Sequence, residues 1–181
     1  MRKKFIFLTI FFIFAFILSL IANAVWNYGF LLSITITMGV FSYHFLMRLL
    51  VGCIINKIFN NNISYNKPWF KTFKFEEKIY SFLKVKKWKK HIPTYNPQTF
   101  SLENTYSQIA SATAQAELVH EIIIILGFLP VLLSIWFGDL AVFVITSVLA
   151  ALIDLVFVIL QRYNRPRILK IKLKNEKGET K

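Results

Sequence analysis

The residues of this chain that are equipped for chemistry lie inside or beside long apolar segments. Three sets of them are spaced so that their members share a helix face. The sets are His44 with Arg48, then Glu117 with His120 and Glu121, and then Asp154 with Gln161 and Arg162. An ionisable group inside a membrane span costs about 3 kcal/mol, so each set is a candidate functional site.

We expect the three sets at one depth in the membrane. Asp154 comes seven residues before Gln161, the first residue after its apolar segment, which places it about 10 Å inside. Arg48 lies about as far from the end of its own segment, and Glu117 and His120 stand at the mouth of theirs. We therefore expect the three sets to converge in one shared polar pocket. The structural alternatives are an Arg48–Asp154 ion pair, a snorkelling Arg48 and solvated glutamates.

A histidine beside carboxylates suits general-base catalysis, because a carboxylate orients the imidazole and stabilises its charged form. We predict His120 as the base, Glu117 as its orienting partner and Asp154 as a further catalytic candidate. Such a base can take a proton from a sugar or lipid hydroxyl that attacks an ester or thioester, while Arg and amide groups stabilise the oxyanion. His44 is more typical of a packed or hydrogen-bonded residue.

Other site chemistries lack their sequence signals. The three His residues show no metal-ligand spacing, so no metal site is expected. A Gly-rich phosphate loop and a GxSxG elbow are both absent from the sequence. Cys53 is the single cysteine, which excludes an internal disulfide, and in an apolar segment it is typical of a small filler. No bound cofactor is predicted.

The elements that position these residues are four apolar runs, at 5–25, 30–55, 118–137 and 140–160. Each is near the ~20 residues that a helix needs to cross a bilayer. We predict an all-α integral membrane protein with four transmembrane helices in two hairpins and a basic amphipathic segment between them. The parts are 1–58 (hairpin 1), 59–116 (basic segment), 117–161 (hairpin 2) and 162–181 (basic tail). A cleaved signal peptide is the alternative for the first run.

Composition and charge support a membrane protein and orient it. The 181 residues are 56% hydrophobic and 17% charged, with a formal net charge of +13 and a mean hydropathy of +0.53. Lys and Arg are absent from both hairpin turns and concentrated at the N-terminus, in the central segment and in the tail. The positive-inside rule therefore predicts a multi-pass protein of the cell membrane with both termini cytoplasmic. Topology explains the basic charge, so nucleic acid is not an expected partner.

The central segment contains a basic amphipathic stretch. Phe75, Ile79, Phe82 and Leu83 recur at helical spacing among lysines, and Trp69 and Trp88 flank them as interfacial anchors. The two interpretations left open are a platform for an anionic lipid or phosphorylated donor, and a plain membrane-surface helix. A second helix is expected to start near Ser101 and to run on into the third span.

Four motifs carry a resemblance to a known family. They are KKWK at 86–89, AELVH at 116–120, Pro130, and the long string QRYNRPR at 161–167. In this order they resemble the glycosyl-4,4'-diaponeurosporenoate acyltransferase family, small bacterial membrane proteins of staphyloxanthin-type carotenoid synthesis, over about 73–171. The family pattern has Asn and Pro where this chain has Asp154 and Val156, and an aromatic where Glu121 stands.

The resemblance implies transfer of a fatty acyl group to a sugar hydroxyl of a glycosylated carotenoid acid or a similar glycolipid. The acyl donor would be acyl-CoA or another activated acyl compound. Membrane lipids would surround the protein. The residues predicted to bind substrate are Gln161, Arg162, Asn164, Arg165, Arg167, Arg48 and Trp88. The alternative function is a non-enzymatic membrane protein that binds anionic lipid or scaffolds a partner. The sequence leaves the oligomeric state open.

Overall fold

The computed structural model describes residues 2–92, 98, 101, 103–138 and 140–179. Within them the chain is helical and contains no strand, as predicted. The α-helices are α1 (Arg2–Trp26), α2 (Gly29–Phe59), α3 (Lys74–Phe82), α4 (Val85–Trp88), α5 (Tyr106–Leu126), α6 (Ser134–Phe137) and α7 (Leu140–Glu179). The short 3-10 turns are η1 (Pro68–Phe70), η2 (Lys89–His91) and η4 (Leu129–Leu133).

Four helical stretches of the described chain are long and apolar enough to cross a membrane, which confirms the predicted number. They are Lys3–Trp26, Gly29–Phe59, Tyr106–Phe137 and Leu140–Lys177. Lipid offers the backbone no hydrogen-bond partner, so apolar runs of this length satisfy their N–H and C=O groups within the helix. Many large apolar side chains of these stretches are exposed, which suits contact with lipid. This is the build of a multi-pass membrane protein.

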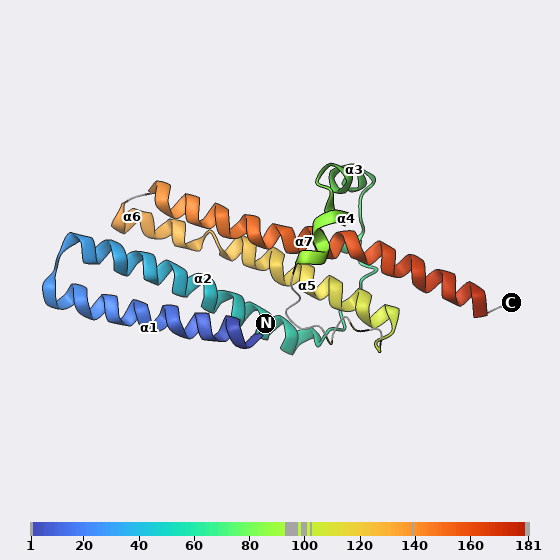
Figure 1. Ribbon diagram of the computed structural model, residues 1–181, viewed down its shortest axis with the longest axis horizontal. Helices are drawn as coiled ribbons and strands as arrows, with labels where there is room; N and C mark the ends of the chain where they lie inside the picture. Colours follow the sequence, from blue (N-terminus) through green and yellow to red (C-terminus); the bar gives the residue numbers. More distant parts are fainter. Residues whose placement is uncertain (1, 93–97, 99–100, 102, 139, 180–181) are drawn as a thin grey trace.

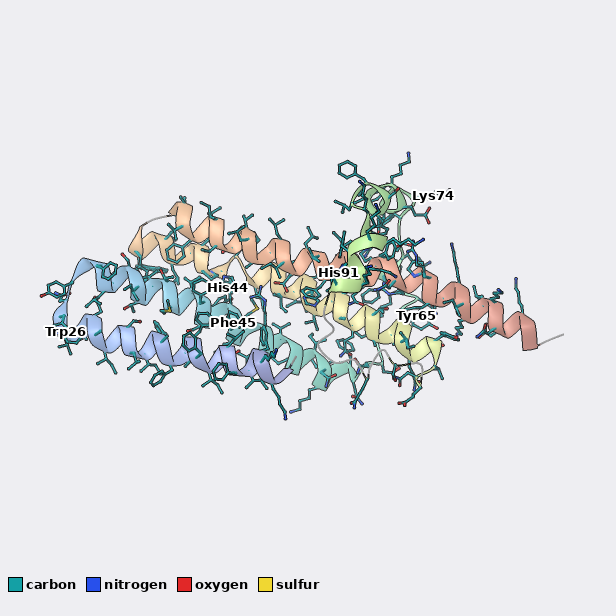
Figure 2. All side chains as sticks on the ribbon, viewed as in Figure 1. Trp26, His44, Phe45, Tyr65, Lys74 and His91 are labelled. Carbon is teal, nitrogen blue, oxygen red and sulfur yellow. The ribbon has the colours of Figure 1, made fainter. Side chains whose placement is uncertain are left out.

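The long helices pack as two neighbouring pairs. Figure 1 shows α1 alongside α2, and α5 alongside α7, with both connecting turns at the same end of the molecule. Phe12 of α1 stacks on Phe41 and Phe45 of α2, with ring centroids 5.2 and 4.9 Å apart. Figure 2 shows Phe45 on the α1 side of α2 and His44 on the side of the other pair. His44 and Arg48 of α2 therefore face α5 and α7.

The third span is interrupted by Pro130. Proline has no N–H, so the carbonyl of Leu126 loses the helical bond it would accept from this position. The Tyr43 hydroxyl of α2 donates to that carbonyl at 2.8 Å. Because an unpaired carbonyl is costly in lipid, this bond stabilises the break and also joins the two helix pairs.

The fourth span and the start of the basic tail form one continuous helix. α7 runs for 40 residues and keeps its helical course through Pro166, which lies inside it. The QRYNRPR string therefore presents its side chains at helical spacing. We call the region where α2 ends, α5 begins and α7 passes Arg162 the basic end of the bundle. Figure 1 shows α3 and α4 beside α7 at this end.

The helix expected to start near Ser101 starts later. Thr105 is its N-cap and forms a capping box with Gln108, whose side chain accepts from the Thr105 N–H at 2.8 Å. Ser101 stands in a bend before the helix. The reason is that Thr105 has a glutamine three residues later, long enough to reach back to the N-cap N–H, whereas Ser101 is followed at that distance by the shorter Asn104, which donates to the Gln98 carbonyl instead. As expected, the helix continues into the third span.

Candidate functional site

The centre of the candidate site is Asp154, a buried carboxylate on α7. Its Oδ2 is 2.5 Å from Nη2 of Arg48 on α2, and its Oδ1 is 2.9 Å from Nδ1 of His120 on α5. Arg48 is held in place by donating to the His44 carbonyl at 3.1 Å. Three different helices thus meet at one carboxylate. The predicted convergence of Arg48, His120 and Asp154 is present in the structure.

The His120 ring is oriented by two contacts. Its Nδ1 faces Asp154, and its plane stacks on Phe157 with centroids 4.7 Å apart and 8° between the planes. A carboxylate at Nδ1 assigns the proton to that nitrogen, which leaves the Nε2 lone pair free to accept one. The His120 side chain is 23% exposed, so a substrate can reach it. This is the arrangement that a general base requires.

Glu117 does not take the part predicted for it. Three residues from His120 on α5, it is fully buried, and its two oxygens accept from Arg162 and Arg165 of α7. Its bond from Arg162 Nη1 is 2.6 Å long. Asp154, and not Glu117, is the carboxylate that contacts His120. Glu117 and His120 lie on the same helix at the predicted spacing, but the Glu117 carboxylate accepts hydrogen bonds from two arginines of α7.

Arg162 and Arg165 also bind the segment around η1 and the first turn of α3. Arg162 donates to both oxygens of Glu76 at 3.1 and 2.7 Å, and to the carbonyls of Trp69 and Lys71. Arg165 donates to the Phe70 carbonyl at 2.7 Å and to Thr113 at 3.2 Å. We call Glu76, Glu117, Arg162 and Arg165 the charge network. Together with the backbone contacts it joins α3, α5, α7 and the segment around η1, so both arginines are engaged by the protein itself.

The electrostatics of Glu76 and Tyr80 follow from this network. Burial alone would raise the pKa of Glu76, but hydrogen bonds from Arg162, Tyr80 and the Phe73 N–H outweigh it and lower the pKa. Burial and the hydrogen bond to Glu76 raise the pKa of Tyr80. Glu76 is therefore a carboxylate and Tyr80 a neutral donor near pH 7. The sequence analysis did not find Glu76, because no local pattern distinguishes it from Glu77.

The remaining predicted residues lie on a more open face at the basic end. Lys89 donates to Asn164 at 3.1 Å, and its Nζ lies 5.1 Å from the centre of the Tyr163 ring. The exposed Arg167 places its guanidinium 3.4 Å from the centre of the same ring. Burial and the neighbouring cations Arg167 and Lys86 lower the pKa of Lys89. Among the described residues, these three cations form no ion pair with an acidic side chain.

Two other predicted residues lie near this face. The half-buried Trp88 packs against the cluster of Tyr80, Val85 and Tyr163 and donates to the Leu83 carbonyl at 2.9 Å. Gln161 is half-buried, and its side chain has no hydrogen bond among the described residues. The structure therefore gives Trp88 a packing role and leaves Gln161 available to a ligand.

His44 lies one helical turn from Arg48, away from the basic end. Its ring is 5% exposed, and neither ring nitrogen has a partner among the described residues. The same holds for the hydroxyl oxygen of Ser147, which lies one turn before Ala150 on α7. Among the described residues no group of His, Cys, Asp and Glu has the arrangement of a metal site.

Comparison with known proteins places the site in a family. The family model described as "Glycosyl-4,4'-diaponeurosporenoate acyltransferase" matches residues 66–173, which is more than half of the chain. The match confirms the resemblance seen in the sequence. It contains the charge network, His120 and Asp154, and it leaves out α1, α2 and therefore Arg48. No curated protein and no solved structure matches the chain.

The charge network predicts a large stability effect for Glu117. Glu117→Gln removes the carboxylate that pairs with the buried Arg165 and one of the two carboxylates that pair with Arg162, and we expect a loss of about 3–5 kcal/mol. Thermal unfolding in detergent micelles measures it. Glu121→Gln is the matched control, because Glu121 lies one turn away and only accepts from Trp69 at an exposed position. Equal unfolding temperatures for the two variants would contradict the structural role.

The lowered pKa of Glu76 predicts an acid-sensitive contribution to stability. Because the folded pKa lies below the ordinary value of about 4.3, the contribution is complete above that pH and is lost as the pH falls through the folded pKa. We expect the wild type to unfold at a higher temperature than Glu76→Gln at pH 7, and the difference to shrink below about pH 4. A difference that stays constant with pH would show that the charge of Glu76 is not involved.

Proposed function

The chain belongs to the glycosyl-4,4'-diaponeurosporenoate acyltransferase family, and from this premise we propose the reaction that it performs. The protein transfers a fatty acyl group from an activated donor to a sugar hydroxyl of a glycosylated carotenoid acid or a similar glycolipid. The observation that supports this best is the Arg48–Asp154–His120 arrangement, with a reachable imidazole at its end.

In this proposal His120 is the general base. Its Nε2 takes the proton of the acceptor hydroxyl as the oxygen attacks the carbonyl carbon of the donor. The tetrahedral intermediate then collapses, the bond from the carbonyl carbon to the leaving group breaks, and the imidazolium returns the proton to that group. Asp154 stabilises the imidazolium through Nδ1, and Arg48 positions Asp154. The donor would be acyl-CoA or another activated acyl compound, and no bound cofactor is invoked.

The anionic part of the donor would bind at the open basic face. Lys89 and Arg167 provide cations there, Asn164 positions Lys89, and Gln161 adds a free amide. A guanidinium and an ammonium are the groups that proteins use to bind phosphate. Arg162 and Arg165, predicted from sequence to bind substrate, act here on the protein instead: they fix the helix that carries Asp154.

We propose the cell membrane as the location, with two transmembrane hairpins, both termini in the cytoplasm and the basic segment at the membrane surface. The Lys-rich parts then lie on the cytoplasmic side, where a soluble acyl donor is available. His120 lies close to that side, so donor and membrane-bound acceptor meet at one depth.

A second candidate function rests on α3. Phe73, Phe75 and Phe82 are strongly exposed, the first two rings stack on one another, and Lys74 and Lys78 lie among them. This combination suits contact with an anionic membrane surface. The exposed surface of α3 favours the non-enzymatic, lipid-binding function only if the site at His120 is inactive. The next experiment distinguishes this function from acyl transfer.

The proposed mechanism predicts that turnover depends on His120. His120→Ala removes the base, and we expect turnover to fall by about 10²–10⁴ while the protein remains inserted in the membrane. Acylated glycolipid is measured by mass spectrometry per correctly inserted protein. His91→Ala, at the end of η2, is the matched control and should retain activity. Normal specific activity in the His120 variant would contradict the proposed mechanism.

Variants of Asp154 test whether its hydrogen bond positions the His120 ring. Asp154→Ala removes the acceptor of the His120 Nδ1–H, so we expect a clear loss of turnover that is smaller than that of His120→Ala. Asp154→Asn keeps an acceptor oxygen and should lose less than the Ala variant. Turnover assays with both variants check this order, and an equal effect of Ala and Asn would show that the hydrogen bond does not position the base.

Cysteine labelling tests the proposed orientation of the chain in the membrane. Single cysteines introduced at Asn27 and Gly138, in a chain with Cys53 replaced by Ser, should react with an impermeant reagent outside intact cells. A cysteine at Lys90 should react only after the cells are opened, because its segment carries the positive charge. Labelling of position 90 in intact cells would overturn the orientation.

A further inference from the structure

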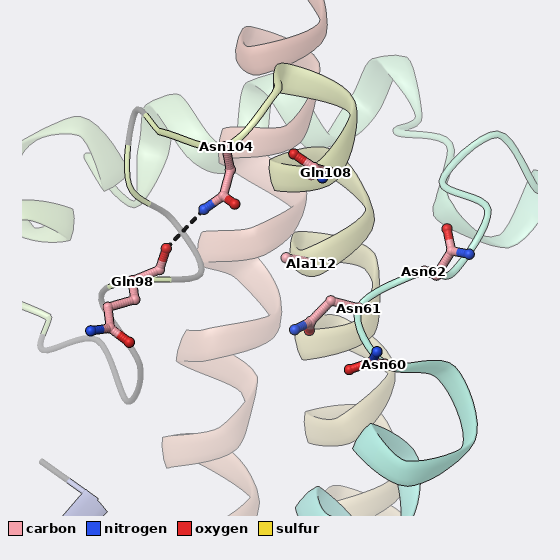
Figure 3. Close-up of a pocket in the computed structure, with 7 residues that line it drawn as sticks. All are labelled: Asn60, Asn61, Asn62, Gln98, Asn104, Gln108 and Ala112. Atoms are coloured by element: carbon pink, nitrogen blue, oxygen red, sulfur yellow. Dashed lines mark hydrogen bonds between the residues drawn. The ribbon is translucent and has the colours of Figure 1, made fainter.

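A second concave site lies at the basic end, apart from the catalytic residues. It is an open hollow of about 590 Å³, and its lining comes from the turn that follows α2, from Gln98 and Asn104, and from α5 (Figure 3). The residues that line it are Asn60, Asn61, Asn62, Gln98, Asn104, Gln108 and Ala112. Six of the seven carry carboxamides, and none carries a charge. This composition is unusual in a chain with a net charge of +13.

Part of the lining is held in place by the protein. The Asn61 N–H donates to the side chain of Gln115 on α5 at 2.7 Å, and Gln115 in turn donates to Asn56 of α2 at 3.2 Å. On the other side, Asn104 donates to the Gln98 carbonyl at 2.8 Å. The rim is therefore built before a ligand arrives, which lowers the entropy lost on binding.

Several amide groups of the lining keep hydrogen-bonding capacity for a ligand. Among the described residues, the side chains of Asn61 and Asn62 form no hydrogen bond, although the backbone N–H of each does. Gln108 uses its carbonyl oxygen for the capping box at Thr105, which leaves its amide N–H groups as donors. Each carboxamide offers donors and an acceptor side by side.

The lining chemistry selects a class of ligand. A phosphate or carboxylate would be bound by Arg or Lys, and the cavity has neither. An apolar ligand would leave the amides without partners on burial. A sugar presents neighbouring hydroxyl groups that both donate and accept, which matches carboxamides. We propose that this cavity, the amide pocket, binds a neutral sugar unit of the glycosylated acceptor.

The position of the amide pocket agrees with this assignment, which rests on the proposed function. Ala112 comes eight residues before His120 on α5, about 12 Å nearer the basic end. An amphiphilic acceptor whose reacting hydroxyl is at His120 directs its polar head group toward this end. The pocket would hold the part of the head group beyond the acylated hydroxyl and so determine which glycolipid is accepted.

The experiment uses two pocket variants and one control. Asn62→Ala removes one amide, and Asn61→Gly removes another while allowing the positive φ of 59° at that position. Asn66→Ala is the control, an exposed amide outside the pocket. We measure KM for the glycosylated acceptor and for the acyl donor in nanodiscs, and binding of methyl glucoside by saturation-transfer NMR with inorganic phosphate as competitor.

Each pocket variant should raise the acceptor KM about 2- to 10-fold and weaken methyl glucoside binding, with kcat and the donor KM unchanged. The control should match the wild type, and phosphate should not displace the sugar. Unchanged acceptor KM in both pocket variants, or displacement by phosphate, would overturn the inference. Sugar binding that depends on Asn61 and Asn62 in a protein without acyl transfer would support the pocket and refute the proposed reaction.

Discussion

The buried carboxylate of Glu117 is the interaction on which the rest of the arrangement depends. It pairs with Arg162 and Arg165 across the contact of α5 with α7, and Arg162 also binds Glu76 in the first turn of α3. An unpaired charge at this depth would be strongly destabilising, so the helices have one favourable register. His120 lies three residues beyond Glu117 and Asp154 eight residues before Arg162, and this register brings them together. The buried charge network therefore sets the geometry of the His120–Asp154 contact, the pair proposed to be catalytic.

Sequence reasoning predicted those features that depend on hydropathy and depth. The four spans follow from run length, and the meeting of Arg48 with Asp154 follows from two costly charges placed at one level. The start of α5 was misplaced by a few residues because Ser101 and Thr105 are both good caps, and only Thr105 has a glutamine at the third position after it.

The assignments within the polar layer needed the structure. The spacing of Glu117 and His120 shows that they share a helix face, but it cannot show which partners approach that face from α7. The QRYNRPR string was read as a binding motif, whereas the structure divides it. Arg162 and Arg165 face inward to the charge network, and Asn164 and Arg167 face the open basic surface. Glu76 lies more than 80 residues from Arg162 and gave no local signal.

The central claim is that His120 and Asp154 work as one unit, and a double-mutant cycle on turnover tests it most directly. The rates of His120→Ala, Asp154→Ala and the double variant are compared per correctly inserted protein. If Asp154 acts only by positioning the His120 ring, the double variant should be no slower than His120→Ala alone. Losses that multiply in the double variant would contradict the account, because they would show two residues acting independently.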